Sequence, residues 1–161
     1  MLEIERDNGA PARPPVITRV PATPAHAARL VLRPGDAAEV AALGVTPEEA
    51  LRTSLARAVW AETYLVDGEV AAMVGLCLSS FAGGHGVPWL LTGPACERHK
   101  KRFLVESRRQ VRRMLGEAAP LINYVHADYA RAVRWLEWLG FTLDAPAKIN
   151  GASFRRFFME A

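Results

Sequence analysis

The hydrophobic pattern is clearest in residues 121–141, where a continuous apolar run gives way to helical spacing. Leu121 to Val125 is rich in residues that favour strands. The apolar positions that follow have the spacing of one helix face: Ala132, Trp135, Leu136 and Leu139. Asp128 stands where an N-cap is expected, and Gly140 where a glycine ends a helix. This segment therefore predicts a strand, a tight turn, a short amphipathic helix and a new strand.

The N-terminal half is divided into short elements by caps and turn residues. Residues 16–20 are predicted as a first strand. Three short helices are expected next, at about 24–33, 37–43 and 47–58, each following a residue that favours the N-cap position: Thr23, Asp36 and Thr46. Trp60–Val66 and Glu69–Leu78 then form a hairpin through a type I′ turn at Asp67-Gly68. The second of these strands is nearly all apolar, which predicts a central strand buried on both faces.

The remaining pattern completes a single domain. Val87–Thr92 is predicted as a strand, and a long helix runs from about Ala95 or Glu97 to Glu117. Residues 144–151 are expected to form a loop, and Ala152–Met159 a last strand that pairs with Phe141–Leu143. The fold class is α/β (α+β), with a mixed central sheet of about six to seven strands flanked by helices. Residues 1–15 are polar and proline-rich and are expected to be an extended or disordered arm before a domain at 16–161.

Composition limits the classes of function. Half of the 161 residues are hydrophobic, which is typical of a globular chain, and no apolar run approaches the ~20 residues that span a bilayer. The two cysteines, Cys77 and Cys96, indicate neither a disulfide framework nor a metal site and are expected as free thiols in a reducing cytoplasm. The net charge of +3 is carried almost entirely by arginine. A GC-rich genome also produces that bias, so it does not by itself indicate nucleic acid.

Several sequence segments carry a family resemblance. An alanine followed eight residues later by Gly-Phe, at the end of a short helix, is similar to the second half of the GNAT (Gcn5-related N-acetyltransferase) fold. More closely, the chain resembles a small phage family with a GNAT-like fold, found in T7-like podophages as an internal virion or virion-assembly protein. The matching segments are NYV at 123–125, Ala132 with RWLEWLGF at 134–141, AALG at 41–44 and FRRF at 154–157. The resemblance covers residues 17–160 and implies a location in the host cytoplasm and the virion.

The resemblance also says where a cofactor would bind. GNAT enzymes hold the CoA pyrophosphate at the N-terminus of the long helix, through a Gln/Arg-x-x-Gly-x-Gly/Ala motif. The best overlay starts at Arg98 and puts Lys101 and Phe103 at the glycine positions, where their side chains should block close approach to the backbone. Four cations could instead attract phosphate: Arg98, Lys100, Lys101 and Arg102. The alternative is a solvated basic helix face.

No catalytic residue is assigned from the sequence. Taking Ala132 as the family's conserved alanine, Tyr129 falls at the family's asparagine position and Leu136 at the position of the tyrosine that acts as general acid. Leucine cannot donate a proton. Glu62 and Glu69 are possible bases without an identified partner. Cys96 stands at a helix start, which should lower the pKa of its thiol. Asn123 and Tyr124 are expected to have structural roles, and His85 is expected to be exposed to solvent. Trp138 is a possible contact residue for a partner.

The sequence therefore predicts a non-catalytic, virion-associated protein on a GNAT-like scaffold, with no cofactor and no metal. Its partners would be other virion proteins or copies of itself, with no membrane. The first alternative is an active N-acetyltransferase that uses acetyl-CoA on an amine. The second is a weak nucleic-acid-binding module that contacts phosphates through one side of the long helix, at Arg98, Arg102, Arg109 and Arg113.

Overall fold

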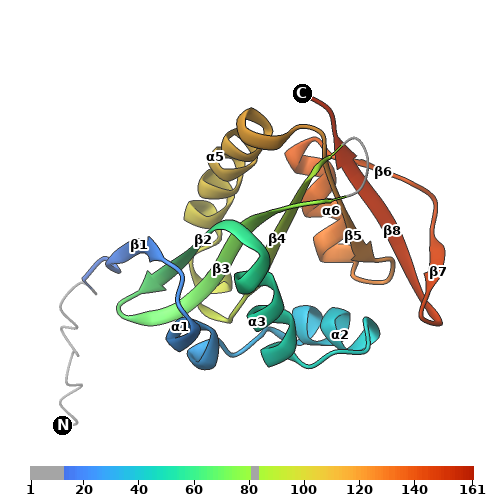
Figure 1. The fold of residues 1–161 in the computed structure, drawn as a ribbon. Coiled ribbons are helices and arrows are strands. Elements are labelled where there is room, and N and C mark those ends of the chain that lie inside the picture. Colours follow the sequence, from blue (N-terminus) through green and yellow to red (C-terminus); the bar gives the residue numbers. More distant parts are fainter. Residues whose placement is uncertain (1–12, 81–83) are drawn as a thin grey trace, which may run out of the picture.

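One mixed sheet with helices on both faces forms the body of the molecule (Figure 1). The structure is a computed structural model and describes residues 13–80 and 84–161. The strands are β1 (Ile17–Pro21), β2 (Ala58–Val66), β3 (Glu69–Leu78), β4 (Gly86–Thr92), β5 (Leu121–His126), β6 (Thr142–Leu143), β7 (Ala147–Ile149) and β8 (Ala152–Met159). The helices are α1 (Pro24–Arg29), α2 (Pro34–Ala42), α3 (Pro47–Arg57), α4 (Ala95–Arg98), α5 (Lys100–Ala118) and α6 (Ala130–Leu139).

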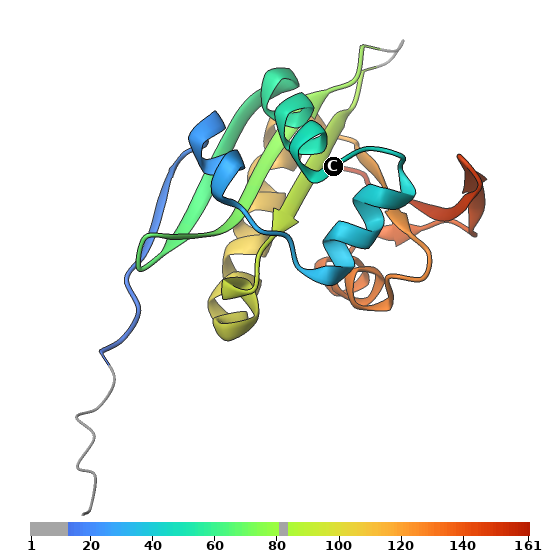
Figure 2. The same cartoon turned by 90° about the horizontal axis from the view of Figure 1, so that it is seen from below.

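The strand order is β1-β2-β3-β4-β5-β8-β6, and β7 pairs with β8. The sheet has eight strands because β7 forms within the predicted loop at 144–151. Apolar side chains of α5 and α6 pack on one face of the sheet, around Met114 and Leu136. The helices α1, α2 and α3 lie on the opposite side of the sheet (Figure 2). The apolar cluster there is centred on Leu30, Val40 and Leu51.

Local signals explain several element ends. The Thr46 side chain accepts a hydrogen bond from the Glu49 backbone N–H at 3.2 Å, and the Glu49 carboxylate accepts from the Thr46 N–H at 2.8 Å. The helix α3 therefore starts after Thr46 as the sequence predicts, and the structure adds the capping box with Glu49. Asp67 and Gly68 both have positive φ, as a type I′ turn requires. The predicted burial of β3 is confirmed from Val70 to Leu76.

Three predicted helix starts are wrong. Asp36 does not cap α2, which begins at Pro34 after Arg33, because the Asp36 carboxylate faces the strand β4 instead. The predicted long helix is broken at His99, whose backbone (φ −125°, ψ 39°) is not helical, so that α4 is a separate short helix. Asp128 does not cap α6, because Tyr129 occupies the N-cap position without a side-chain cap. Gly140 ends α6 with φ 101°, as predicted.

The strands β4 and β5 touch at one end and then separate. They are parallel and share a single register pair, Gly86 with Leu121, with a Gly86 N–H···O=C Pro120 bond of 2.9 Å. Gly86 fits there because a Cβ would lie 2.6 Å from the Ala118 carbonyl oxygen. Beyond this pair the backbone of β5 pairs only with β8 among the described strands. The two strands therefore leave an opening that widens toward Thr92 and His126.

Two sequence expectations concern the ends and surroundings of the domain. The predicted arm at 1–15 falls mainly on residues 1–12, which lie outside the described residues. Across the described part of the chain, no helix has both the length and the apolar character needed to cross a membrane.

Candidate functional site

The opening between β4 and β5 leads into a cleft of about 600 Å³. Its walls come from both strands, from α2 and α6, and from the segment that joins β4 to α5. Its lining includes Asn123 and Trp89, near the point where the strands join, and Lys100 and Arg102 at the start of α5. Because most of the wall is apolar, the few polar groups in it define what the cleft can bind.

The helix α2 is hydrogen-bonded to the free edges of both strands. On β4, the Arg33 N–H donates to the Thr92 carbonyl oxygen at 2.9 Å, and the Thr92 N–H donates to Asp36 Oδ2 at 2.9 Å. On β5, the His126 N–H donates to Glu39 Oε1 at 2.7 Å. Side chains and backbone of one short helix thus satisfy edge groups that the missing strand pairing would otherwise leave unbonded.

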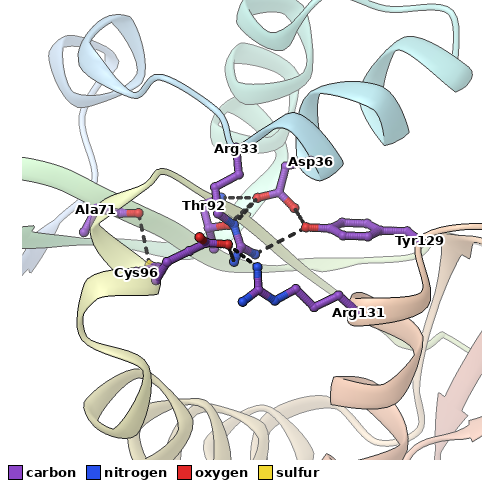
Figure 3. A network of polar contacts seen from close by, with 8 residues as sticks. Arg33, Asp36, Ala71, Thr92, Cys96, Tyr129 and Arg131 are labelled. Carbon is purple, nitrogen blue, oxygen red and sulfur yellow. Dashed lines mark hydrogen bonds and ion pairs between the residues drawn. The ribbon is translucent and has the colours of Figure 1, made fainter.

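Asp36 is the centre of a buried polar cluster (Figure 3). Its carboxylate also accepts from the Thr92 hydroxyl, and from the Tyr129 hydroxyl at 3.1 Å, while the Arg33 guanidinium lies 3.7 Å away. The Tyr129 ring lies over Gly35, where a Cβ would come within 2.4 Å of the ring. Burial, followed by the nearby Asp36 charge, raises the pKa of Tyr129 to about 12. The hydroxyl therefore stays protonated at neutral pH and donates to Asp36.

Glu39 is a second carboxyl in the cleft wall. Burial raises its pKa to about 7, opposed by the bond from the His126 N–H and assisted by the charge of Asp36 one turn earlier. A carboxyl with this pKa exchanges protons readily at neutral pH, which suits a general acid or base. The sequence offered no sign of this role, since Glu39 lies in an alanine-rich stretch without a motif.

An ion-pair chain crosses the outer end of the cleft. Glu97 of α4 lies 3.6 Å from the Arg33 guanidinium and also pairs with Arg131 of α6. These contacts connect the segment after β4 to the start of α6, across the gap between the two strands. Glu97 and Arg131 are both nearly half exposed, so this chain is solvated and costs little to open.

The four predicted phosphate-binding cations are not equivalent. Arg98 pairs with Glu69 at 2.6 Å, and neither it nor Lys101 lines the cleft. Lys100 and Arg102 do line it, are exposed, and have no partner within residues 13–80 and 84–161. The structure therefore divides the cluster into two cations at the cleft and two beside it.

Cys96 differs from the sequence expectation. It is buried, and its thiol donates to the Ala71 carbonyl oxygen at 3.2 Å. Burial raises the pKa of Cys96 to about 12, whereas the sequence predicted a lowered pKa. The prediction was wrong because α4 spans only four residues and its start is packed under β3. Among the described residues, no group of His, Cys, Asp or Glu could hold a metal ion.

Other sequence candidates have structural partners. Glu62 bonds to Gln110 at 2.8 Å and to Arg113 at 3.0 Å, and neither it nor Glu69 lines the cleft. Leu136, at the family's tyrosine position, is in the core. Asn123 Nδ2 donates to the Pro88 carbonyl oxygen at 2.7 Å, which joins the two strands just beyond their single register pair.

Comparisons with solved structures identify the fold. One similar structure is an acetyltransferase of the GNAT family from Streptococcus pneumoniae, with a TM-score of 0.58 and 16% identity over 90% of this chain and 99% of that one. Another is the yncA protein from Salmonella typhimurium, solved with its cofactor acetyl-CoA (TM-score 0.53, 19% identity, 90% and 92% covered). A third is a spermidine N-acetyltransferase from Vibrio cholerae, with a TM-score of 0.58 and 13% identity over 89% of this chain and 93% of that one.

The chain thus has a single-domain α/β GNAT fold, and the predicted fold class is confirmed. At these identities the likeness concerns the fold and not the activity. No family model and no curated protein matches the sequence. The predicted phage origin, partners and nucleic-acid contacts stay predictions.

Proposed function

We propose that this chain is an acyltransferase that moves an acetyl group from acetyl-CoA to an amine. The observation that carries the proposal is the single register pair between β4 and β5, which opens a cleft whose lining includes two cations at the start of α5, Lys100 and Arg102. Structures of the same fold include acetyltransferases, one of them solved with acetyl-CoA. This favours the catalytic alternative over the non-catalytic virion role that the sequence favoured.

The residues present fit a CoA ester through side chains. Its phosphates would lie against Lys100 and Arg102 at the start of α5, where free backbone N–H groups also favour anions. Lys101 and Phe103 replace the family's glycines, so we expect these side-chain cations to contribute more of the phosphate binding than in enzymes with that motif. The apolar cleft wall suits the uncharged arm of the cofactor. When bound, acetyl-CoA supplies an acetyl group activated as a thioester.

The chain's own residues would supply proton transfer and positioning. Glu39, with a pKa of about 7, would accept the proton that an acceptor ammonium must lose before its nitrogen can attack. Asn123, bonded to Pro88 across the strands, would hold the inner end of the cleft at a fixed width. Tyr129, kept protonated, would fix the position of Asp36 and thus of α2 in the wall of the cleft.

Calorimetric titration of the full chain with acetyl-CoA tests the cofactor site. We expect saturable binding at one site per chain with a micromolar Kd, weakened at least about tenfold in a Lys100→Ala, Arg102→Ala double variant. The matched control is Arg98→Ala with Lys101→Ala, which removes the same charge beside the cleft and should weaken binding far less. Equal losses in the two variants would mean that only net charge matters. Absence of binding to the wild-type chain would overturn the proposal.

A non-catalytic role in virion structure or assembly is the second candidate. It is favoured by the buried leucine at the family's tyrosine position and by α2, whose groups already occupy the strand-edge atoms Thr92 N and His126 N. This candidate rests on the phage-family resemblance of the sequence. It predicts that the protein is present in purified phage particles at a fixed copy number. Absence from particles and from assembly intermediates would count against it.

A further inference from the structure

The side of α5 that faces away from the sheet carries four exposed cations. At about 100° per residue, their positions fall within about 100° of one another around the helix axis. The buried residues of the helix, Ser107, Gln110 and Met114, lie on the opposite side. Over the length of this surface the helix rises about 16 Å. We name it the outer face of α5, formed by Lys101, Arg108, Arg109 and Arg112.

The acidic residues of α5 do not lie on the outer face. Glu106 accepts a hydrogen bond from the Tyr64 hydroxyl at 3.3 Å. Glu117 pairs with Arg113 at 2.9 Å and accepts from the Trp60 indole N–H. Tyr64 and Trp60 both belong to β2, so the two carboxylates are on the side of the helix next to that strand. The helix therefore separates a side of mixed charge from a side that is only positive.

The cations of the outer face have no carboxylate partner. Within residues 13–80 and 84–161, Lys101, Arg109 and Arg112 make no hydrogen bond or ion pair. Arg108 contacts an aromatic ring instead: its guanidinium carbon lies 3.8 Å from the centre of the Trp138 ring on α6. Even with the exposed Glu137 of α6 counted, this surface keeps an excess of positive charge.

The structure thus changes the stripe of arginines that the sequence predicts for phosphate contacts. Arg98 and Arg113 of that stripe are paired with carboxylates, and Arg102 lines the cleft. Arg109 alone of the four stands on the outer face. The contact residue that the sequence suggested, Trp138, is 43% exposed at the border of this face. A row of free cations therefore lies beside an exposed aromatic ring.

We propose that the outer face of α5, together with Trp138, binds single-stranded nucleic acid. Its cations would contact successive phosphates along the strand, and a base would stack against the Arg108–Trp138 pair. Cations and a ring contact the backbone and the faces of bases, which every sequence presents, so little sequence preference is expected. This role does not depend on the proposed acetyl transfer.

The outer face suits a nucleic acid better than an anionic membrane. A helix that lies in a membrane interface buries a broad apolar stripe among the lipids. The apolar side of α5 is packed on the sheet, and Val105 is the one large apolar residue exposed on this helix. A membrane would therefore gain attraction to the charge without apolar burial, whereas a single strand uses both the cations and the ring.

Fluorescence anisotropy with a labelled oligo(dT) of about 20 nucleotides tests the role of the cations. We expect saturable binding by the full chain at about 50 mM salt, weakening steeply toward about 200 mM. The double variant Arg109→Gln, Arg112→Gln should bind about tenfold more weakly at the lower salt. The slope of log K against log salt should also become shallower by about 1.4, because two phosphate contacts are lost.

The double variant Arg52→Gln, Arg57→Gln is the matched control. It removes the same charge from exposed arginines of α3, a helix on the opposite side of the sheet (Figure 2). This control should bind oligo(dT) within about twofold of the wild type and keep its salt slope. Equal losses in the two double variants would show that only net charge acts and would overturn the proposal. Absence of saturable binding by the wild type at about 50 mM salt would overturn it as well.

An abasic strand of the same length separates a nucleic-acid site from a site for any polyanion. It has the phosphates of oligo(dT) without the bases, so the wild type should bind it about tenfold more weakly. Trp138→Leu should weaken oligo(dT) binding by a similar factor, leave the salt slope unchanged, and affect the abasic strand little. Equal binding of the two strands by the wild type, or tighter binding to phosphatidylserine vesicles than to oligo(dT), would overturn the proposal.

Discussion

Two polar networks connect helices to the sheet. One takes the place of missing strand pairing, and the other adds to apolar packing that is already present. The network at the mouth of the cleft connects α2, the end of β4 and the start of α6 through Arg33, Asp36, Thr92 and Tyr129. These elements meet where β4 and β5 have already separated, so hydrogen bonds there stand in for the missing strand pairing. Asp36 and Thr92 are almost fully buried.

The network between α5 and β2 connects two elements that apolar packing already holds together. Gln110 donates to Glu62 and to the Tyr64 hydroxyl, both at 2.8 Å, and Arg113 pairs with Glu62 at 3.0 Å while its guanidinium lies 3.8 Å from the centre of the Trp60 ring. The apolar core already joins α5 to the sheet here. The Arg113 side chain is 38% exposed, so solvent screens its charge. Similar residue types should therefore contribute very differently to stability in the two places.

The largest effect is expected from Asp36→Ala. The change leaves the Thr92 N–H, the Thr92 hydroxyl and the Tyr129 hydroxyl without their acceptor, and leaves Arg33 without its nearest buried charge. We expect the free energy of unfolding to fall by about 3–5 kcal/mol in urea titrations. Glu48→Ala, an exposed acid on α3, is the control and should change it by less than about 1 kcal/mol. A comparable small loss for Asp36→Ala would show that the mouth is not held by this carboxylate.

Glu39→Gln should change the pH dependence of stability. The folded-state pKa of Glu39 is about 7 against an ordinary value of 4.5, so between these values the folded chain keeps a proton that the unfolded chain has lost. Wild-type stability therefore falls as pH rises through this window, by about 3 kcal/mol if Glu39 acts alone. Glutamine keeps a carbonyl for the His126 N–H and has no charge to bury. The variant should match the wild type near pH 4.5 and be more stable at pH 8; parallel unfolding curves would contradict the raised pKa.

Tyr129→Phe should have an intermediate effect. It removes the hydroxyl that donates to Asp36 at 3.1 Å and accepts from Arg33 at 3.4 Å, while the ring that covers Gly35 is kept. We expect a loss of about 1–2 kcal/mol in the free energy of unfolding, because Asp36 keeps its two bonds from Thr92. A loss as large as that for Asp36→Ala would mean that Tyr129, and not Asp36, is the centre of the cluster.

The smallest effect is expected from Arg113→Met in the network between α5 and β2. Methionine keeps apolar contact with Trp60 but loses the ion pairs to Glu62 and Glu117. We expect a loss of less than about 1 kcal/mol, reduced further at high salt. A salt-independent loss equal to that for Asp36→Ala would remove the distinction between the two networks.

The sequence predicted elements whose signals are local. The helix start at Thr46, the Asp67-Gly68 turn and the helix end at Gly140 each depend on residues close to them in the sequence, and the structure confirms all three. Apolar spacing placed β3 in the centre of the sheet for the same reason.

Two of the four predicted phosphate-binding cations, Lys100 and Arg102, line the cleft. The polar groups at the mouth of the cleft were not predicted, because their contacts join distant parts of the chain. Asp36 follows Pro-Gly and precedes a helical stretch, which is also the local pattern of an N-cap, yet its partner Thr92 is 56 residues away. Glu39 meets His126 across 87 residues, and no motif surrounds either residue. Cys96 stands at a helix start, but its thiol is buried against Ala71 of a strand 25 residues earlier. For Asp36 and Cys96 a long-range contact changed the role that the local pattern had assigned, and for Glu39 it created a role that the local pattern did not indicate.

The account depends most on the cleft between β4 and β5 being the place where an acyl-CoA binds. Amide hydrogen exchange of the full chain, measured with and without saturating acetyl-CoA, tests this directly. We predict slower exchange in β4 (Gly86–Thr92), in β5 (Leu121–His126) and at the start of α5 beside Lys100 and Arg102. Unchanged exchange in both strands, or protection confined to the exposed arginines later in α5, would contradict it.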